Sequence, residues 1–234
     1  MKPNLPALLS FTGGYVDTAG FLALQGLFTA HVTGNFVTFG AAIAMGTSGA
    51  LAKLLALPTF CVVVILARMT SRRLTARGHS ALRLMLIIQL ALFTLGAIFA
   101  IWLGPFTNGD GWPALITGMT LVSAMAIQNA AHRGYLATAP PTTLMTGTTT
   151  QIMMDIADLI GGLPAEARAD LRPRLVRMSI AVALFAAGCA AAAVLFILLN
   201  FRCLAIPPVL GLLALWLNLR QPEEAAPYAG GPKT

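Results

Sequence analysis

The sequence contains few charged residues: they make up 10% of its 234 residues, whereas 57% are hydrophobic. Soluble domains carry about 25% charged residues, so this chain has too few to solvate the surface of a water-soluble protein. Apolar runs recur along it instead, and a helix needs about 20 apolar residues to cross about 30 Å of hydrocarbon. Composition therefore predicts an all-α, multi-spanning integral membrane protein.

Catalytic and metal-binding motifs are also missing. The sequence has no His-Glu-x-x-His pair, no Gly-x-Ser-x-Gly elbow and no phosphate-binding glycine loop. Its three cysteines share no metal-ligand spacing and lie in or beside apolar segments, which favours buried, inert thiols. Asp17 and Asp155 lack the Gly-x-Gly-Asp context expected of an intramembrane aspartyl protease. We therefore expect no enzyme activity, no cofactor and no bound metal.

The net charge is +7, but the basic residues gather beside apolar segments rather than forming a nucleic-acid-binding surface. The positive-inside rule places arginine-rich loops in the cytoplasm. Two loops qualify, and their residues are Arg68, Arg72, Arg73, Arg77 and Arg83 in the first and Arg168, Arg172, Arg174 and Arg177 in the second. The loop Gly104–Gly111 has Asp110 and no basic residue, so we expect it outside, while Lys53 and Arg202 are exceptions that also fall outside.

Topology follows from this charge pattern. Eight stretches are apolar or partly apolar, but if all eight crossed, the second arginine loop would lie outside. The conflict disappears if 29–47 and 140–161 are re-entrant half-helices. The six full spans are then 7–28, 51–68, 82–103, 112–131, 178–199 and 204–219. The expected location is the bacterial inner membrane, with both termini on its cytoplasmic side and 222–234 as a disordered cytoplasmic tail. The segment containing Asp17 stays in place as a membrane helix because it lacks a cleavage site.

The two re-entrant segments share a Thr-Gly-polar triplet, Thr33-Gly34-Asn35 and Thr146-Gly147-Thr148. A polar residue lies 17 or 18 positions before each glycine: Asp17 in the first case and Asn129 in the second. We therefore predict two repeats, 1–104 and 105–221. Each has three spans, an odd number, so the copies insert in opposite orientations, as in many secondary transporters. The triplets should meet near the bilayer centre and present the amino ends of their helices there.

These motifs also carry a family resemblance. The segments concerned are Gly14–Asp17, Phe28–Asn35, Gln128–Ala130 and Pro141–Thr148. Together they resemble the YoaK-like family of small bacterial inner-membrane proteins, over about residues 5–220. The resemblance implies a polytopic bacterial membrane protein. It implies no substrate or reaction, because that family is itself described as a domain of unknown function.

Two carboxylates stand out as candidate site residues. Asp17 lies near mid-depth of the first span, where a charge is costly and usually marks an ion or substrate pathway. The alternative is a structural carboxylate that caps a turn at Gly13-Gly14 or pairs with a neighbour. Asp155 and Gln151 lie one turn apart and could line a polar crevice. Alternatively, Asp155 and Asp158 are solvated near the cytoplasmic surface.

The remaining candidates are neutral side chains and one histidine. The triplet residues could cap the half-helices, bind a ligand, or do both. His31 is either a hydrogen-bonded structural group or a proton relay. Gln128 and Asn129 diverge by about 100° on a helix, so only one should point inward. The predicted substrate-binding set is Asp17, His31, Thr33, Gly34, Asn35, Gln128, Asn129, Thr146, Gly147, Thr148, Gln151 and Asp155.

The leading functional hypothesis is a small transporter or permeation unit for a small polar or anionic solute. Asp17, together with Asp155 or His31, would couple or gate the movement of this solute. The expected partners are the lipid bilayer and an unidentified small solute, with no nucleic acid, and the small size is compatible with a homodimer. The alternatives are a non-transporting assembly or regulatory partner and an intramembrane enzyme. A cavity reaching Gly34 and Gly147 would favour transport, and a dry core would favour the partner role.

Overall fold

The computed structural model describes residues 4–143, 145–162 and 164–220, and these form helices joined by turns, without a β-strand. The predicted all-helical class is thus confirmed; the tail 222–234 lies outside the described residues. The helices are α1 (Leu5–Ala23), α2 (Gly34–Met45), α3 (Ala50–Ala76), α4 (Ala81–Leu103), α5 (Trp112–Tyr135), α6 (Met145–Ile160), α7 (Ala165–Leu199), the 3₁₀ turn η1 (Asn200–Ala205) and α8 (Pro207–Arg220).

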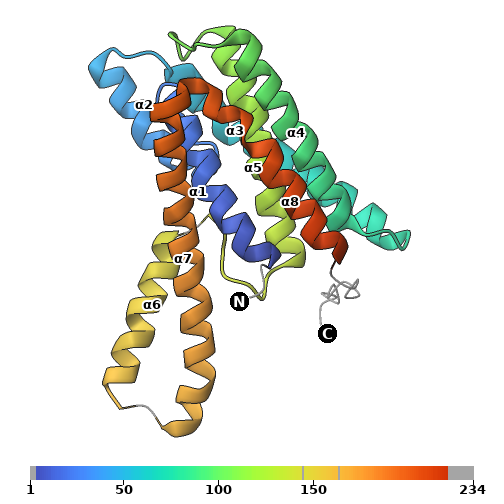
Figure 1. The fold of residues 1–234 in the computed structure, drawn as a ribbon, viewed down its shortest axis with the longest axis vertical. Coiled ribbons are helices and arrows are strands. Elements are labelled where there is room, and N and C mark those ends of the chain that lie inside the picture. The colour runs from blue at the N-terminus through green and yellow to red at the C-terminus, as the bar shows by residue number, and fades with distance from the viewer. Residues whose placement is uncertain (1–3, 144, 163, 221–234) are drawn as a thin grey trace.

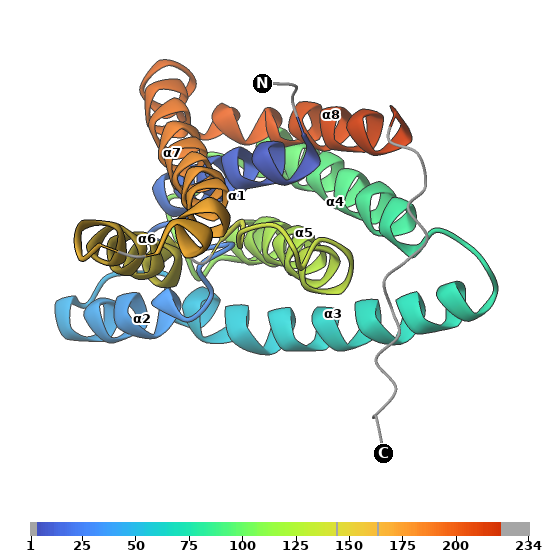
Figure 2. The same cartoon turned by 90° about the horizontal axis from the view of Figure 1, so that it is seen from below.

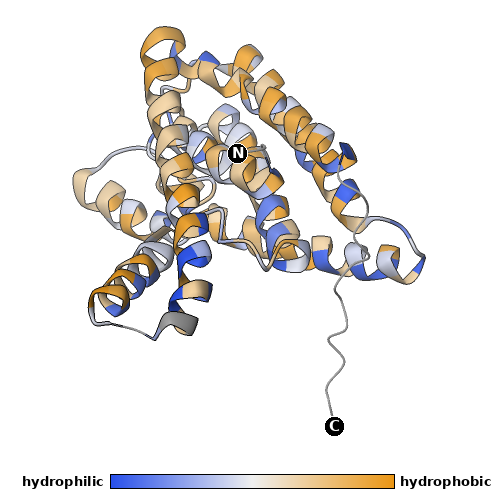
Figure 3. Ribbon diagram, turned by 60° about the horizontal axis from the view of Figure 1, so that its bottom comes forward, coloured by the Kyte–Doolittle hydropathy of each residue, from blue (hydrophilic) through white to orange (hydrophobic). Residues whose placement is uncertain are grey.

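The connecting turns are segregated between the two ends of the molecule. Figure 1 shows that α1 begins and α8 ends at the same end of the bundle as the α3–α4 and α6–α7 turns. The loop 104–111 and η1 lie at the opposite end. The two arginine-rich regions therefore lie toward one end, and hydrophilic colours gather on the N-terminal part of α7 (Figure 3).

Both arginine-rich segments were predicted as loops, and this is wrong. α3 continues to Ala76 and α7 already begins at Ala165, so most of these arginines are helical. Arginine, leucine and alanine are all strong helix formers, and a hydropathy pattern marks only where an apolar stretch ends, not where its helix ends. At 35 residues, α7 is about 52 Å long, and with α6 it extends beyond the rest of the bundle (Figure 1).

Within the described residues, α3, α4, α5 and the continuous segment Ala167–Ala205 are long and apolar enough to cross a membrane. The protein is therefore membrane-embedded through apolar helices. The predicted spans 7–28 and 204–219 are also helical, but α1 is interrupted by polar residues and α8 has only 14 residues, about 21 Å. The segments 29–47 and 140–161 hold only short helices, of 12 and 16 residues.

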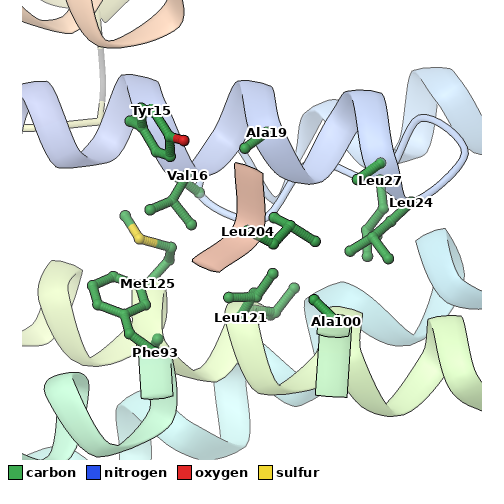
Figure 4. Packing of buried hydrophobic residues seen from close by; sticks show 14 of the residues in the cluster. Tyr15, Val16, Ala19, Leu24, Leu27, Phe93, Ala100, Leu121, Met125 and Leu204 are labelled. Atoms are coloured by element: carbon green, nitrogen blue, oxygen red, sulfur yellow. The ribbon is translucent and has the colours of Figure 1, made fainter. Parts of the chain in front are cut away.

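The main apolar core lies between α1 on one side and α4 and α5 on the other (Figure 4). Val16 of α1 and Leu24, the residue directly after α1, face Leu121 and Met125 of α5, and Leu204 of η1 fills the space between them. All five side chains are at most 1% exposed. α1 is thus held in the centre of the molecule, which fixes the position of Asp17.

Glycines allow α1 and α7 to cross with their backbones in contact. A Cβ atom on Gly14 would lie 2.0 Å from the carbonyl oxygen of Phe185, and one on Gly188 would lie 2.2 Å from that of Phe11. Small residues at such crossings let membrane helices approach closely. The predicted turn at Gly13-Gly14 is therefore wrong, because α1 runs through both residues without a break. Figure 2 shows the two helices overlapping near their crossing.

At the other end of the molecule, Asp110 caps α3. Its carboxylate accepts hydrogen bonds from the backbone N–H groups of Gly49 and Leu51, both at 2.8 Å. Nearby, Lys53 is 5% exposed and donates from Nζ to the carbonyl oxygen of Gln25 at 2.8 Å. The side chain of Gln25 in turn donates to the Phe106 carbonyl. Asp110 thus fastens the loop 104–111 directly to the start of α3, and Lys53 ties α3 to Gln25, which in turn holds the loop.

Replacing Asp110 with alanine should lower the stability of the protein by about 1–2 kcal/mol, the usual cost of losing a helix cap. Thermal unfolding of the purified protein in detergent measures the change. Asp170→Ala is the matched control, because Asp170 is an exposed carboxylate on α7. Equal melting temperatures for the two variants would show that the Asp110 cap contributes nothing.

Candidate functional site

Asp17 anchors the irregular segment that precedes α2. Its Oδ1 accepts hydrogen bonds from the backbone N–H groups of Ala30 at 2.7 Å and His31 at 3.2 Å. The side chain is 5% exposed, so a carboxylate inside the fold is satisfied by backbone donors rather than by a cation. Thr29 adds a second link, because its hydroxyl donates to the Val16 carbonyl at 3.1 Å.

Asn35 closes the same segment into a loop. Its Oδ1 accepts from the Phe28 N–H at 2.9 Å, and its Nδ2 donates to the Phe28 carbonyl at 2.8 Å. The Asn35 side chain thus hydrogen-bonds to both backbone groups of Phe28, as the backbone of a neighbouring β-strand would. Asn35 is 2% exposed. The prediction that Asn35 caps α2 is wrong, because its side chain turns back to Phe28. Thr33 occupies the N-cap position without a side-chain cap hydrogen bond.

The segment before α6 is held in a similar way. Thr143 donates its hydroxyl hydrogen to Oδ1 of Asn129 at 2.8 Å. Asn129 and Thr143 are 14 residues apart, and the same separation joins Asp17 to His31. In both places a polar residue of a long helix thus holds the irregular chain that leads into a short helix. Leu144 lies outside the described residues.

Gln128 lies at the centre of a buried polar network. Its Nε2 donates to the Leu9 carbonyl at 2.9 Å and to the Thr142 hydroxyl at 3.3 Å, and its Oε1 accepts from Gln89 at 2.8 Å. The network joins α1, α4, α5 and the chain before α6. Gln128 is fully buried, whereas Asn129 is only partly buried. The divergence of these two side chains matches the prediction, although both are engaged in hydrogen bonds.

Asp155 forms an ion pair that sequence reasoning missed. Arg174 donates to its two oxygens, from Nε at 3.1 Å and from Nη2 at 2.6 Å, and Gln151 donates to Oδ1 at 2.7 Å. Asp155 is 0% exposed and Arg174 is 50% exposed. The interpretation of Asp155 as a solvated surface carboxylate is therefore wrong, whereas Asp158 is exposed. The ion pair fastens α6 to α7, the helix on which it packs.

The triplets are partly accessible, since each has exposed residues but also one buried side chain, Asn35 in the first and Thr148 in the second. His31, Thr33, Thr146 and Gly147 are exposed, and a Cβ on Gly147 would meet nothing within 4 Å. α6 begins at Met145, so Thr146, Gly147 and Thr148 lie in its first turn rather than before it. This corrects the expectation that Thr146 caps the helix. Gly34 lies against His31 and Phe28.

The short helices are not in extensive contact with each other among the described elements: α2 packs on α3, and α6 packs on α7. The expected meeting of the two triplets thus stays a prediction. Two crevices lie among α3, α4 and α5, and neither is lined by Asp17 or by a triplet residue. Among the described residues, no group of three or more His, Cys, Asp or Glu side chains could hold a metal ion.

Three residues that hold polar side chains or loops in place were not predicted from the sequence to do so: Gln89, Arg174 and Asp110. Gln89 carried a detectable signal, because it is an amide in the middle of an apolar span. Arg174 was considered only as one of the positive charges that set the topology. Its separation of 19 residues from Asp155 suggests no ion pair until α6 and α7 are known to be antiparallel neighbours. Tyr15 was also overlooked; its hydroxyl donates to the Cys203 carbonyl at 2.9 Å and ties α1 to η1.

A family model described as a protein of unknown function, DUF1275, matches residues 5–217. This match covers nearly the same residues as the YoaK-like resemblance and is consistent with it. No curated protein and no solved structure matches the chain.

Proposed function

Because the chain belongs to the DUF1275 family, whose function is unknown, we propose a function from its own geometry. The protein is a small transporter or permeation unit for a small polar or anionic solute. It sits in the bacterial inner membrane with both termini in the cytoplasm, is not an enzyme, and is compatible with assembly as a homodimer. Its two halves, 1–104 and 105–221, are inverted repeats.

The order of the helices supports the repeat. A long helix, a short helix and two further helices follow one another in each half: α1, α2, α3 and α4, then α5, α6, α7 and α8. The packing follows the same correspondence. The packing of α1 on α7 corresponds to that of α5 on α3, and the packing of α2 on α3 corresponds to that of α6 on α7. The packing of α4 on α5 likewise corresponds to that of α8 on α1. α4 and α8, which are equivalent, pack on each other. Exchanging the two halves leaves these contacts unchanged, as a pseudo-twofold axis requires. The packing of α3 on α4 is an exception, because no comparable packing of α7 on α8 is found among the described elements.

The observation that carries the transport proposal is the pair of tethered irregular segments. Asp17 holds 30–31 and Asn129 holds Thr143, and each segment leads into a helix too short to cross the bilayer. Irregular backbone at membrane depth is tolerated where protein or a watery cavity satisfies its polar groups. Transporters with inverted repeats place their substrate site at such broken helices. Arg174 would then retain α6 on the cytoplasmic side through its ion pair with Asp155.

Flux into proteoliposomes tests this proposal. Stopped-flow light scattering with formate, acetate, phosphate, sulfate and glycerol should give faster entry of at least one solute than empty liposomes give. Gly147→Phe should reduce that flux to the background level by placing a ring at the start of α6. Gly134→Phe is the matched control, because a Cβ at either position meets nothing within 4 Å. Entry no faster than in empty liposomes for every solute, or equal flux through both variants, would contradict the proposal.

Two observations favour a second candidate, a non-transporting assembly or regulatory partner. The first is that neither of the two crevices described above reaches Gly34 or Gly147. The second is that Asp17, Asn35, Gln128 and Asn129 all have hydrogen-bond partners within the protein, which is sufficient to explain their presence as structural. In that case Asp17→Asn, which keeps an acceptor oxygen, would leave cellular function intact. The transport proposal expects the same variant to fold and to lose most of the flux.

A further inference from the structure

An apolar crevice opens where α3 and α4 diverge. Although these helices are consecutive and antiparallel, each packs more extensively on α5 than on the other. The space between them has a volume of about 310 Å³. Its walls run from Val63 to Leu74 on α3 and from Ala81 to Leu92 on α4, and Ser123 and Ile127 of α5 form its floor.

The shape of this crevice suits an extended occupant. The α3 wall, from Val63 to Leu74, is about 16 Å long at 1.5 Å per residue. A second hollow of about 370 Å³ shares Leu92 and Ser123 with the first and continues along α5 to Leu115. Together they form one groove, lined mainly by aliphatic side chains and methionine, with a few serine and threonine hydroxyls among them. A compact polar solute would find few hydrogen-bond partners in this groove, whereas a hydrocarbon chain would contact apolar side chains along its whole length.

One end of the groove is cationic. Leu74 and Ala81 mark the end nearest the α3–α4 turn, where Arg72, Arg73 and Arg77 are all exposed. Helical periodicity puts residues three or four apart on one face, so Arg77 continues the face of α3 that Thr70 and Leu74 present to the groove. Guanidinium groups bind phosphate strongly and in a bidentate manner. The same element thus offers an apolar slot and, next to it, a group suited to a phosphate.

We propose that this groove binds an anionic phospholipid, with one acyl chain between α3 and α4 and its phosphate at Arg77 and Arg73. Basic pockets between membrane helices on the cytoplasmic side bind anionic lipid headgroups, and the α3–α4 turn lies at the predicted cytoplasmic end. The inference does not depend on transport, because none of the residues that line the groove belongs to the triplets or their anchors.

Native mass spectrometry of the full chain tests this proposal, with phosphatidylglycerol and phosphatidylcholine of identical acyl chains added to the detergent-purified protein. The protein should retain phosphatidylglycerol more strongly than phosphatidylcholine. Arg77→Gln should weaken the binding of phosphatidylglycerol about fivefold, as expected for the loss of one basic residue near a lipid surface. Arg172→Gln is the matched control, because Arg172 is an exposed arginine of the other basic segment. It should leave binding unchanged.

A second variant tests the slot itself. Thr70→Trp fills the groove and should lower the retention of both lipids, while Ser123→Leu does the same from the floor if the tryptophan variant is poorly folded. Equal retention of the two lipids by the wild-type protein would overturn the headgroup assignment. Unchanged retention in the filled variants would overturn the groove as the site. A dimer that dissociates when either groove variant is introduced would show that a second copy of the chain occupies it.

Discussion

Replacing Gly14 with alanine should destabilise the protein by at least about 3 kcal/mol, the upper end of the range for overpacked cores. The new Cβ would lie 2.0 Å from the Phe185 carbonyl oxygen and 3.2 Å from the Cys189 nitrogen. Both are backbone atoms of α7, so no side chain can rotate away, and the two helices must separate. Separation would expose apolar surface along α1, which lies at the centre of the core.

Thermal unfolding and size-exclusion profiles of the detergent-purified protein measure this loss. Gly188→Ala should behave like Gly14→Ala, since its Cβ would lie 2.2 Å from the Phe11 carbonyl oxygen at the same crossing. Gly40→Ala is the control: a Cβ there meets nothing within 4 Å, and alanine is the better helix former. A Gly14 variant as stable as the Gly40 variant would show that α1 and α7 do not approach in this way.

Asp17→Ala should also lower the stability of the protein strongly. It removes the acceptor for the N–H groups of Ala30 and His31, and each buried donor left unsatisfied costs about 1–3 kcal/mol. The segment before α2 would then lose its anchor on α1. Asp17→Asn retains an oxygen at the same position, so it should lower stability much less than alanine does.

Comparing the two Asp17 variants distinguishes stabilisation by the hydrogen-bond-accepting oxygen from stabilisation by the negative charge. Asp158→Ala, at an exposed carboxylate of α6, controls for a general effect of removing negative charge and should leave the melting temperature unchanged. If the asparagine and alanine variants unfold at the same temperature, the charge itself, rather than the accepting oxygen, stabilises the segment. That result would contradict the tether described here.

The sequence predicted the helical class, the short helices in 29–47 and 140–161 and the burial of Asp17, because each has a local signature. Hydropathy marks apolar helices, and the glycine at position 46 ends α2 with a left-handed backbone conformation, φ 63°. The cost of burying a carboxylate marks Asp17. Each of these features can be recognised without knowing which helices are neighbours.

The rest depends on tertiary contacts. Asn35 looks like a helix cap in the sequence, yet it binds Phe28, seven residues earlier. Gln128 reaches Leu9, 119 residues away. Whether Arg174 meets Asp155 depends on how α6 and α7 turn toward each other. The end of α3 was misplaced because helix propensity continues where hydropathy falls. Side-chain partners of this kind could be predicted only after the fold is known.

The central claim is that two half-helices enter the membrane from opposite sides. Membrane-impermeant thiol labelling of single-cysteine variants in oriented vesicles tests it, in a background without Cys61, Cys189 and Cys203. Thr33→Cys should react from outside together with Thr107→Cys, and Thr146→Cys should react from the cytoplasmic side together with Arg73→Cys. Labelling of Thr33→Cys and Thr146→Cys from the same side would contradict the inverted arrangement.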